Sequence, residues 1–461
     1  MRLLSVLTLV SLLGMVPLIS FAQSTKDDSA SQVPVLTQEE SDKRFTNYFQ
    51  STYIYQYKPG MNAAYSGMNS LQAATENSYT FSATAHLGWK IADHTEIFLD
   101  PEVISGVPFS SLNGLGGFTN GEATRAQGMD PKLYRQRLFI RHTQNFGGEL
   151  EKVDEDINQF AQLVSKNRFV LTAGNFSLLD VMDDNEYAKD PRTQFSNWGN
   201  MTYAAFDYAA DARGYGWGLA GEWYQDNWVF RLARMTVPIE PNMLPLDFNL
   251  LNHYGDTLEI ERGHQFAGLP GKVRLLMYRD RQIMARFDDA TNYLLVNNAQ
   301  GTQAILNARN TEQIKMGIGL NLEQKITPDI GVFFRGMISD GQTETLAFTE
   351  ADNSLSLGVT LFGKLWNRPD DHLGVAVLQN GLSAARRNYL QAGGVSFFIG
   401  DYAGPSQIIN YAPEQIMETY YSWNLAKKVW FSANYQRIQN PGYNSDRGPA
   451  NFFGMRVHAE Y

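Results

Sequence analysis

The chain has 461 residues, of which 43% are hydrophobic, 13% aromatic and 19% charged, with 39 Gly, 17 Pro and no Cys. The lack of cysteine excludes disulfide scaffolds, cysteine-based zinc sites and thiol catalysis. A formal net charge of −10 provides no basic footprint for a nucleic-acid partner, so we expect none.

The first 22 residues predict a secretory signal peptide. Met1-Arg2 is a short positive start, residues 3–21 carry no charge, and Ser20-Phe21-Ala22 is a small-x-small cleavage site. An uncleaved membrane anchor is the alternative, although Gly14 and Pro17 interrupt the apolar run. Residues 23–44 are polar and predict a flexible N-terminal arm. Because no later segment reaches ~18 consecutive apolar residues, the exported protein is either soluble or a β-barrel.

From about Phe45 onward the dominant pattern is alternation of apolar and polar residues with period two, which indicates strands whose faces meet different surroundings. The last nine residues show it most clearly, with apolar residues at 453, 455, 457, 459 and 461. A half-buried strand of a soluble protein also alternates. A terminal strand that ends on an aromatic residue, here Tyr461, is typical of outer-membrane barrels.

Several such strands occur in pairs joined by tight turns. The pairs are 79–90 with 96–103, 215–223 with 228–232, 316–322 with 330–334, 355–365 with 373–377, and 417–425 with 429–435. Strands of ~9–11 residues, with short turns alternating with long connections, are typical of porins. We therefore predict an all-β transmembrane antiparallel β-barrel over residues 45–461, with about 16 strands, long extracellular loops and short periplasmic turns. Counting alone does not decide between 16 and 18 strands. Residues 149–165 are the one predicted helix, or else a long loop.

The run YRQRLFIRHTQ predicts a wall of the pore. Strict alternation puts Arg135, Arg137, Phe139 and Arg141 on one face and Tyr134, Leu138 and Ile140 on the other. Since a charge at the bilayer midplane costs ~2–4 kcal/mol on the lipid face, the arginines should face the lumen. Charged pore walls set selectivity. The alternative, compatible with this one, is a structural salt-bridge ladder with the acidic residues predicted to face the lumen nearby, Glu96, Asp100 and Glu102.

Residues 175–200 form an acidic, turn-rich connection, and we expect this loop to fold inward and constrict the channel. Its carboxylates are a weak candidate for a Ca²⁺ site, because they lack the spacing and the glycine of an EF-hand: Asp180, Asp183, Asp184 and Glu186. We assign no cofactor and no firm metal site.

The sequence carries no local motif of an enzyme. Neither GxSxG nor HExxH occurs. Gly216, Gly218 and Gly221 formally match GxGxxG, but apolar residues alternate through this segment as in a strand, so we interpret it as part of the barrel.

Several segments resemble the carbohydrate-selective porin family of Gram-negative outer membranes, the OprB type, over about residues 45–461. They include GWKIADHTEIFLDPEVISG, RLFIRHTQNFGGE, DDNEYAKDPRTQFSNW and RPDDHLGVAVLQNGLS. The resemblance implies a monomeric 16-stranded barrel with passive diffusion of sugar-like solutes through a constriction. By motif, Arg137 and Arg141, with Arg135 just before them, would be constriction arginines. Glu102 would lie on an adjacent wall, and Asp190 and Arg192 in or near the constriction loop.

We therefore expect an outer-membrane porin, embedded in lipid, for small polyhydroxylated solutes. The solute is either a neutral sugar or a sugar acid or cyclic hydroxy acid such as quinate or shikimate, depending on how many of Arg135, Arg137 and Arg141 are neutralised. A non-selective general porin, an outer-membrane barrel enzyme and a soluble exported β-protein are the alternatives. The acidic stretch at about 151–158 departs from the family pattern, as does an N-terminus without a tryptophan-glycine start, and both leave the first strand and the solute open.

Overall fold

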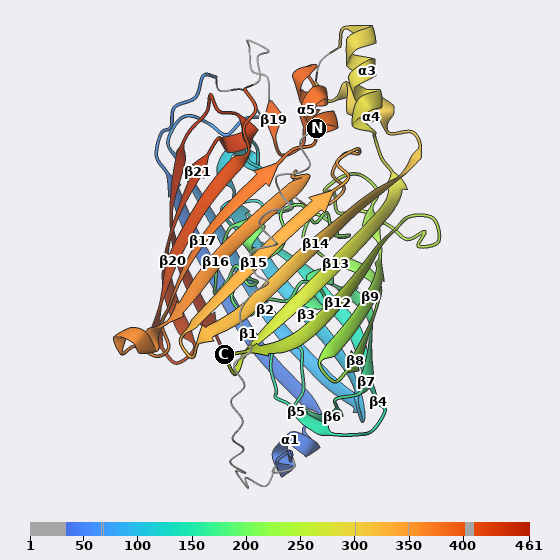
Figure 1. The fold of residues 1–461 in the computed structure, drawn as a ribbon, viewed down its shortest axis with the longest axis vertical. Helices are drawn as coiled ribbons and strands as arrows, with labels where there is room; N and C mark the ends of the chain where they lie inside the picture. Colours follow the sequence, from blue (N-terminus) through green and yellow to red (C-terminus); the bar gives the residue numbers. More distant parts are fainter. Residues whose placement is uncertain (1–33, 66, 68, 300, 349, 402–409) are drawn as a thin grey trace, which may run out of the picture. The chain divides into compact units, whose positions relative to one another are not determined.

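The computed structural model describes residues 34–461 except 66, 68, 300, 349 and 402–409, and it shows a closed antiparallel barrel of sixteen strands (Figure 1). The predicted signal peptide and residues 23–33 of the predicted arm lie outside the described residues. The barrel strands, in order around the wall, are β1 (Phe45–Lys58), β2 (Glu76–Ala92), β3 (Thr95–Val107), β4 (Lys132–Asn145), β7 (Arg168–Phe176), β8 (Gly216–Gln225), β9 (Trp228–Met235), β12 (Tyr254–Phe266), β13 (Leu269–Ile283), β14 (Glu312–Thr327), β15 (Ile330–Ser339), β16 (Asn353–Phe362), β17 (His372–Gly381), β20 (Glu414–Ala426), β21 (Val429–Gln439) and β22 (Ala450–Glu460). The prediction of about 16 strands is confirmed.

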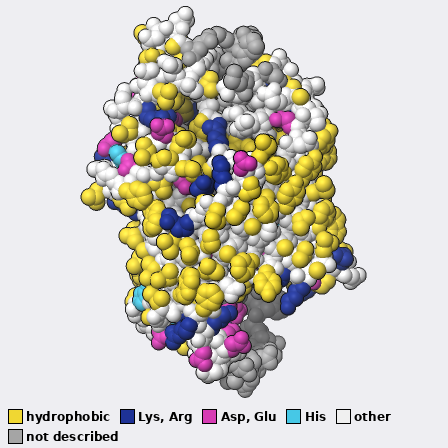
Figure 2. Space-filling view, turned by 180° about the vertical axis from the view of Figure 1, so that it is seen from behind, with side chains coloured by type: hydrophobic (Ala, Val, Ile, Leu, Met, Phe, Trp, Pro, Cys, Tyr) yellow, Lys and Arg dark blue, Asp and Glu magenta, His cyan; other side chains and the backbone are white. Residues whose placement is uncertain are grey.

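The alternation in the sequence explains the two faces of this wall. On β22, Met455 and Val457 are 50% and 45% exposed on the outside, whereas Arg456 and His458 are buried inside. β22 pairs with β1, with Val457 opposite Tyr53, and this pairing closes the barrel. Figure 2 shows hydrophobic side chains gathered over the rear face of the wall. Such an apolar outer band is what a lipid bilayer requires of a transmembrane barrel.

The two ends of the barrel differ. The end that holds Tyr461 carries turns of two residues, at 93–94, 226–227, 267–268, 328–329 and 427–428. Short turns mark the periplasmic end of an outer-membrane barrel. The helices α3 (Phe287–Asn297), α4 (Gln303–Ala308) and α5 (Ala384–Gln391) lie at the opposite, extracellular end (Figure 1). Two periplasmic connections are longer than these turns: residues 146–167, which include the segment for which a long loop was one prediction, and residues 363–371 with the 3₁₀ turn η3 (Gly363–Trp366).

The helix predicted at 149–165 is wrong. This segment forms a hairpin of β5 (Leu150–Val153) and β6 (Gln162–Ser165). Conversely, the arm that was predicted to be irregular contains a helix, α1 (Gln38–Asp42), whose N-terminus is fixed by a capping box of Thr37 and Glu40. Two further small sheets pair β10 (Val237–Pro238) with β11 (Leu246–Asp247) and β18 (Val395–Ser396) with β19 (Gly400–Asp401). Within the part of the chain that the structure describes, no helix is both long and apolar enough to cross a membrane.

The connection from β7 to β8, residues 177–215, fills much of the barrel interior. It contains η2 (Leu178–Asp180) and the short helix α2 (Trp198–Met201), and its aromatic side chains, such as Phe195 and Phe206, belong to the main buried cluster. Two buried arginines on different strands fix it to the wall. Arg335 of β15 donates to the carbonyls of Ala188 (2.6 Å) and Asn200 (2.8 Å). Arg456 of β22 donates to the carbonyls of Pro191, Thr193 and Gln194. The inward loop thus extends beyond the predicted range of 175–200. The remaining 3₁₀ turns are η1 (Phe109–Ser111) and η4 (Pro441–Tyr443).

Candidate functional site

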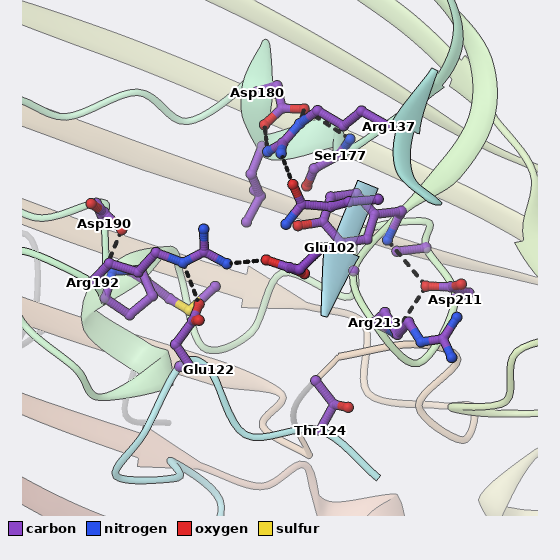
Figure 3. Close-up of a pocket in the computed structure, with 18 of the residues that line it drawn as sticks. Glu102, Glu122, Thr124, Arg137, Ser177, Asp180, Asp190, Arg192, Asp211 and Arg213 are labelled. Atoms are coloured by element: carbon purple, nitrogen blue, oxygen red, sulfur yellow. Dashed lines mark hydrogen bonds and ion pairs between the residues drawn. The ribbon is translucent and has the colours of Figure 1, made fainter. Parts of the chain in front are cut away.

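A cavity of about 490 Å³ lies where the inner wall of β2–β4 faces the connections 108–131 and 177–215. Its charged lining is nearly balanced. Six carboxyl groups line it (Glu102, Glu122, Asp180, Asp183, Asp190 and Asp211), as do five basic groups (Arg137, Arg141, Lys189, Arg192 and Arg213). Figure 3 shows Arg137 and Arg192 each next to a carboxylate, and Arg213 on another side of the same space, with its backbone bonded to Asp211. Oxygen acceptors and guanidinium donors that surround one space suit a solute rich in hydroxyl groups.

Arg137 on β4 is neutralised by the inward loop. Its Nη2 and Nε atoms lie 2.7 and 2.8 Å from the two carboxylate oxygens of Asp180, which is a two-pronged ion pair. Nη1 also donates to Asp100 at 3.3 Å. Burial by itself raises the pKa of Asp180, but the Arg137 guanidinium outweighs it and holds this pKa below its ordinary value. The pair therefore remains charged at neutral pH and anchors η2 against the wall.

Arg192 is the second neutralised cation. Its Nη2 atom lies 2.7 Å from Glu102 of β3, and its Nε atom donates to Glu122 at 2.9 Å. Glu102 also accepts hydrogen bonds from the hydroxyls of Thr84, at 2.6 Å, and Tyr134. Glu102, predicted to lie on an adjacent wall, and Arg192, predicted to lie in or near the constriction loop, are direct partners within the cavity.

Two further arginines have no such partner. Among the described residues, neither the Arg141 nor the Arg213 guanidinium has a carboxylate oxygen within 4 Å; Arg213 contacts Asp211 only through its backbone N–H, at 2.8 Å. Arg141 donates to the backbone carbonyl of Asn158 at 2.8 Å and lies over the ring of Phe139. Arg213 stacks over the ring of Tyr134, with its guanidinium carbon 4.2 Å from the ring centroid. Their remaining donors make both arginines candidates for direct contact with a solute.

The prediction that Arg135 lines the pore is wrong. Arg137 pairs with Asp100, but the next pair in the register is Arg135 with Pro101, so Gln136 is an extra residue in a β-bulge. Gln136 is buried inside and lines the cavity. Arg135 lies on the outer side of the wall, where its guanidinium stacks over Trp217 at 4.9 Å. Because of this extra residue, the inward and outward sides are exchanged for the residues before Gln136, compared with strict alternation from Arg137.

The other predicted pore residues divide into two groups. Phe139, Asp190, Arg192 and Glu102 line the cavity, as do Arg137 and Arg141. Glu96 and Asp100 are buried on the inner wall beside it without lining it. The predicted ladder is formed in part: Asp100 contacts Arg137, and its Oδ2 atom lies 2.9 Å from His86 Nδ1, whereas Glu96 has no described ion pair.

The weak Ca²⁺ candidate is not supported, because its carboxylates have separate cationic partners. Asp180 binds Arg137, Asp183 binds Arg335 at 3.0 Å, and Asp184 binds Lys189 at 2.7 Å. No group of three metal-ligating side chains is present among the described residues, and Glu186 joins none.

Sequence reasoning missed Glu122, Asp211 and Arg213 as cavity residues. All three lie in connections, where neither alternation nor a local motif marks the side chain that will point inward. Their only sequence signal is that they lie in two further segments that resemble the carbohydrate-selective porins, GLGGFTNGEA for Glu122 and DYAADARGYGWG for Asp211 and Arg213.

A sixteen-stranded barrel with an apolar outer band, an inward loop and a charged internal cavity defines an outer-membrane diffusion channel. The chain belongs to the carbohydrate-selective porin, OprB family, whose profile matches residues 102–461. It is a porin of the Gram-negative outer membrane, through which small solutes pass, as the resemblance of its motifs implied.

The solved structure of one porin shows the same fold. The chain is similar to Pseudomonas putida OprB in its high-pH structure, with 15% identity, a TM-score of 0.68 and coverage of 92% of this chain and 96% of that one. It is also similar to the outer-membrane channel DcaP of Acinetobacter baumannii, with 8% identity, a TM-score of 0.48 and coverage of 90% and 97%. A sequence comparison with curated proteins found no match.

Proposed function

We propose that this porin conducts neutral, polyhydroxylated solutes of about monosaccharide size by passive diffusion. The observation that carries this proposal is the near balance of charge in the cavity, six carboxyl groups against five basic groups. A balanced lining offers donors and acceptors to hydroxyl groups without favouring either sign of ion. The cavity volume of about 490 Å³ also falls within the roughly 300–1,000 Å³ typical of small-molecule sites.

In this proposal the eyelet, the narrow part of the channel, is formed by Arg137, Arg141, Arg192, Glu102 and Arg213. The four carboxylates that hold Arg137 and Arg192 keep these guanidiniums in place, and both arginines line the cavity. Arg141 and Arg213 supply donors that no carboxylate uses. Phe139 is 4% exposed, so it supports the Arg141 guanidinium from below instead of offering a broad face to the solute.

The test is single-channel conductance in a planar bilayer, titrated with glucose and separately with gluconate. A balanced eyelet predicts that glucose blocks the ion current in a saturable way and that gluconate blocks it no better. Block by gluconate alone would contradict the proposal and would identify an anion-selective eyelet.

The second candidate substrate class is sugar acids and cyclic hydroxy acids such as quinate and shikimate. Arg141 and Arg213 favour it, since a carboxylate gains most from guanidiniums without an ion pair. The gluconate arm of the same titration distinguishes this candidate from the first.

We also propose that the barrel acts as a monomeric channel, without catalysis and without a nucleic-acid partner. The support is the family, whose members are porins, and the negative net charge of the chain. Mass measurement of the detergent-solubilised protein tests the monomer, and a stable trimer would contradict it.

A further inference from the structure

The periplasmic hairpin β5–β6 is the feature that the porin function does not yet explain. Residues 146–167 form the longest periplasmic connection and include the acidic stretch 151–158, which departs from the family pattern. Figure 1 shows β5 and β6 at the periplasmic end, near α1. Between the two strands, residues 154–161 form a turn in which Asp156 and Gln159 make an isolated bridge. Asn158 adopts a left-handed conformation with φ of 54°, which asparagine tolerates well.

The tip of this hairpin reaches the solute cavity. Ile157, Asn158 and Gln159 line the same cavity as Arg137 and Arg141. The side-chain amide of Asn158 donates to Asp100 at 2.7 Å, and its backbone carbonyl accepts from Arg141 at 2.8 Å. The hairpin tip therefore contacts the inner wall at two neighbouring strands, β3 and β4, on the periplasmic side of the eyelet.

An aromatic anchor holds the tip in place. Phe160 is 1% exposed, and its ring centroid lies 6.0 Å from that of Phe98 on the inner side of β3. Lys90 of β2 lies over the other side, 5.2 Å from the ring centroid. Because burying an apolar ring is favourable, Phe160 favours the inserted position of the tip over a solvated one.

The N-terminal arm clamps the hairpin from the periplasmic side. Lys43 lies 2.6 Å from Glu155, which also accepts a hydrogen bond from Thr46 at 2.7 Å. Lys152 on β5 lies 2.7 Å from Glu40 of α1. These two ion pairs join α1 and the adjacent Lys43 to β5 and to the first residues of the turn. They give the helix in the arm a structural role that a flexible leader would not have.

We propose that the hairpin tip, residues 157–159, forms a second constriction on the periplasmic side of the eyelet and positions Arg141 for solute contact. This inference rests on the proposed function for the nature of the solute. The narrowing itself is independent of the solute, because the KCl conductance measures it. A solute that leaves the eyelet past the Arg141 guanidinium next meets Asn158, whose backbone carbonyl holds this guanidinium. The channel then has two filters in series, one from the extracellular loop 177–215 and one from the periplasmic hairpin.

Cysteine labelling tests the constriction directly, because the chain contains no cysteine. Asn158→Cys is modified with a charged methanethiosulfonate reagent while the single-channel KCl conductance is recorded. The expected result is a loss of conductance on modification, since the added group occupies the path. The matched control is Asp154→Cys, in the same turn but with a side chain that is 85% exposed and does not line the cavity, and its modification should leave the conductance unchanged. Equal responses at the two positions, or none at Asn158→Cys, would overturn the proposal.

A shortened hairpin provides the opposite perturbation. Val153 and Gln162 pair directly, so residues 154–161 are replaceable by an Asn-Gly turn that joins the two strands. We expect a higher KCl conductance and weaker solute block, because the second filter is gone and Arg141 has lost its backbone partner. Unchanged conductance in a folded, heat-modifiable barrel would overturn the proposal; if this variant does not fold, the labelling result decides alone. The wild type itself also tests the proposed function. If glucose does not block it, while modified Asn158→Cys and the shortened hairpin both change the KCl conductance as expected, the proposed function is contradicted and the second constriction is still supported.

Discussion

The charge balance of the eyelet depends most visibly on one ion pair, Arg137 with Asp180. The substitution Asp180→Asn keeps the size of the side chain and an oxygen that can accept from the Ser177 backbone N–H, a bond of 3.0 Å in the wild type. It removes the negative charge that lies 2.7 Å from the guanidinium. Arg137 keeps its contact with Asp100 at 3.3 Å, so the arginine should remain in the eyelet with one of its two carboxylate partners removed.

The size of the effect follows from Coulomb's law. Taking away one unit charge at about 5 Å from a bound carboxylate changes its energy by about 1–3 kcal/mol for an effective dielectric constant between about 80 and 20. This corresponds to roughly 5- to 150-fold tighter binding of gluconate. A neutral sugar has no net charge for this field to act on, so block by glucose should change much less.

The assay is the reversal potential in a KCl gradient together with block by gluconate and by glucose. Asp180→Asn should shift the reversal potential toward chloride selectivity and strengthen the gluconate block. The control is Asp256→Asn on β12, which removes an equivalent two-pronged pair, with Arg234 at 2.7 and 2.8 Å, and does not line the cavity. Equal shifts in the two variants, or no shift in Asp180→Asn, would refute the reasoning that local charge at Arg137 sets selectivity.

Three further outcomes are expected. Arg137→Ala combined with Arg141→Ala should weaken glucose block in bilayer recordings, whereas Arg135→Ala, on the outer wall, should leave it unchanged; an effect of Arg135→Ala would contradict the bulge at Gln136. Arg335→Ala leaves Asp183 buried without its partner, a cost of about 3–5 kcal/mol, so the thermal unfolding midpoint should fall and the conductance rise as loop 177–215 loosens. Lys152 and the Thr37 backbone lower the pKa of Glu40 to about 2, below its usual value of about 4.3. The ion pair between Glu40 and Lys152 therefore stabilises the contact between arm and hairpin fully above about pH 4.3, and this stabilisation is lost as the pH falls toward about 2. Current noise from hairpin motion should therefore be constant from pH 8 to pH 5 and increase only in more acidic solution, and a midpoint near neutral pH would point to another group.

Much of the wall was predictable because the bilayer imposes a simple rule on it. Every residue on the outside of a spanning strand must be compatible with lipid, so the alternation of Phe453, Met455 and Val457 with Arg456 and His458 indicates the orientation of β22 without further information. The connections obey no such rule. Glu122 and Arg213 reach the cavity through the course of loops 108–131 and 177–215, which depends on long-range contacts such as those of Arg335 and Arg456 with loop carbonyls.

The same dependence explains the two local errors of prediction, and both lie next to the eyelet. Extrapolating alternation from Arg137 assumes an unbroken ladder, yet Asp100 and Pro101 pair with Arg137 and Arg135, so one extra residue moves Arg135 to the outside and Gln136 to the inside. The segment 149–165 has charged and apolar residues at helical spacing. In the structure, however, Phe160 is buried against Phe98, and Glu155 and Lys152 are paired with the arm. A hairpin can make all of these contacts at once. In both cases the partner of the segment lies on another part of the chain. A sequence pattern reports what a segment favours alone, whereas the eyelet is built where β4, the inward loop and the periplasmic hairpin meet.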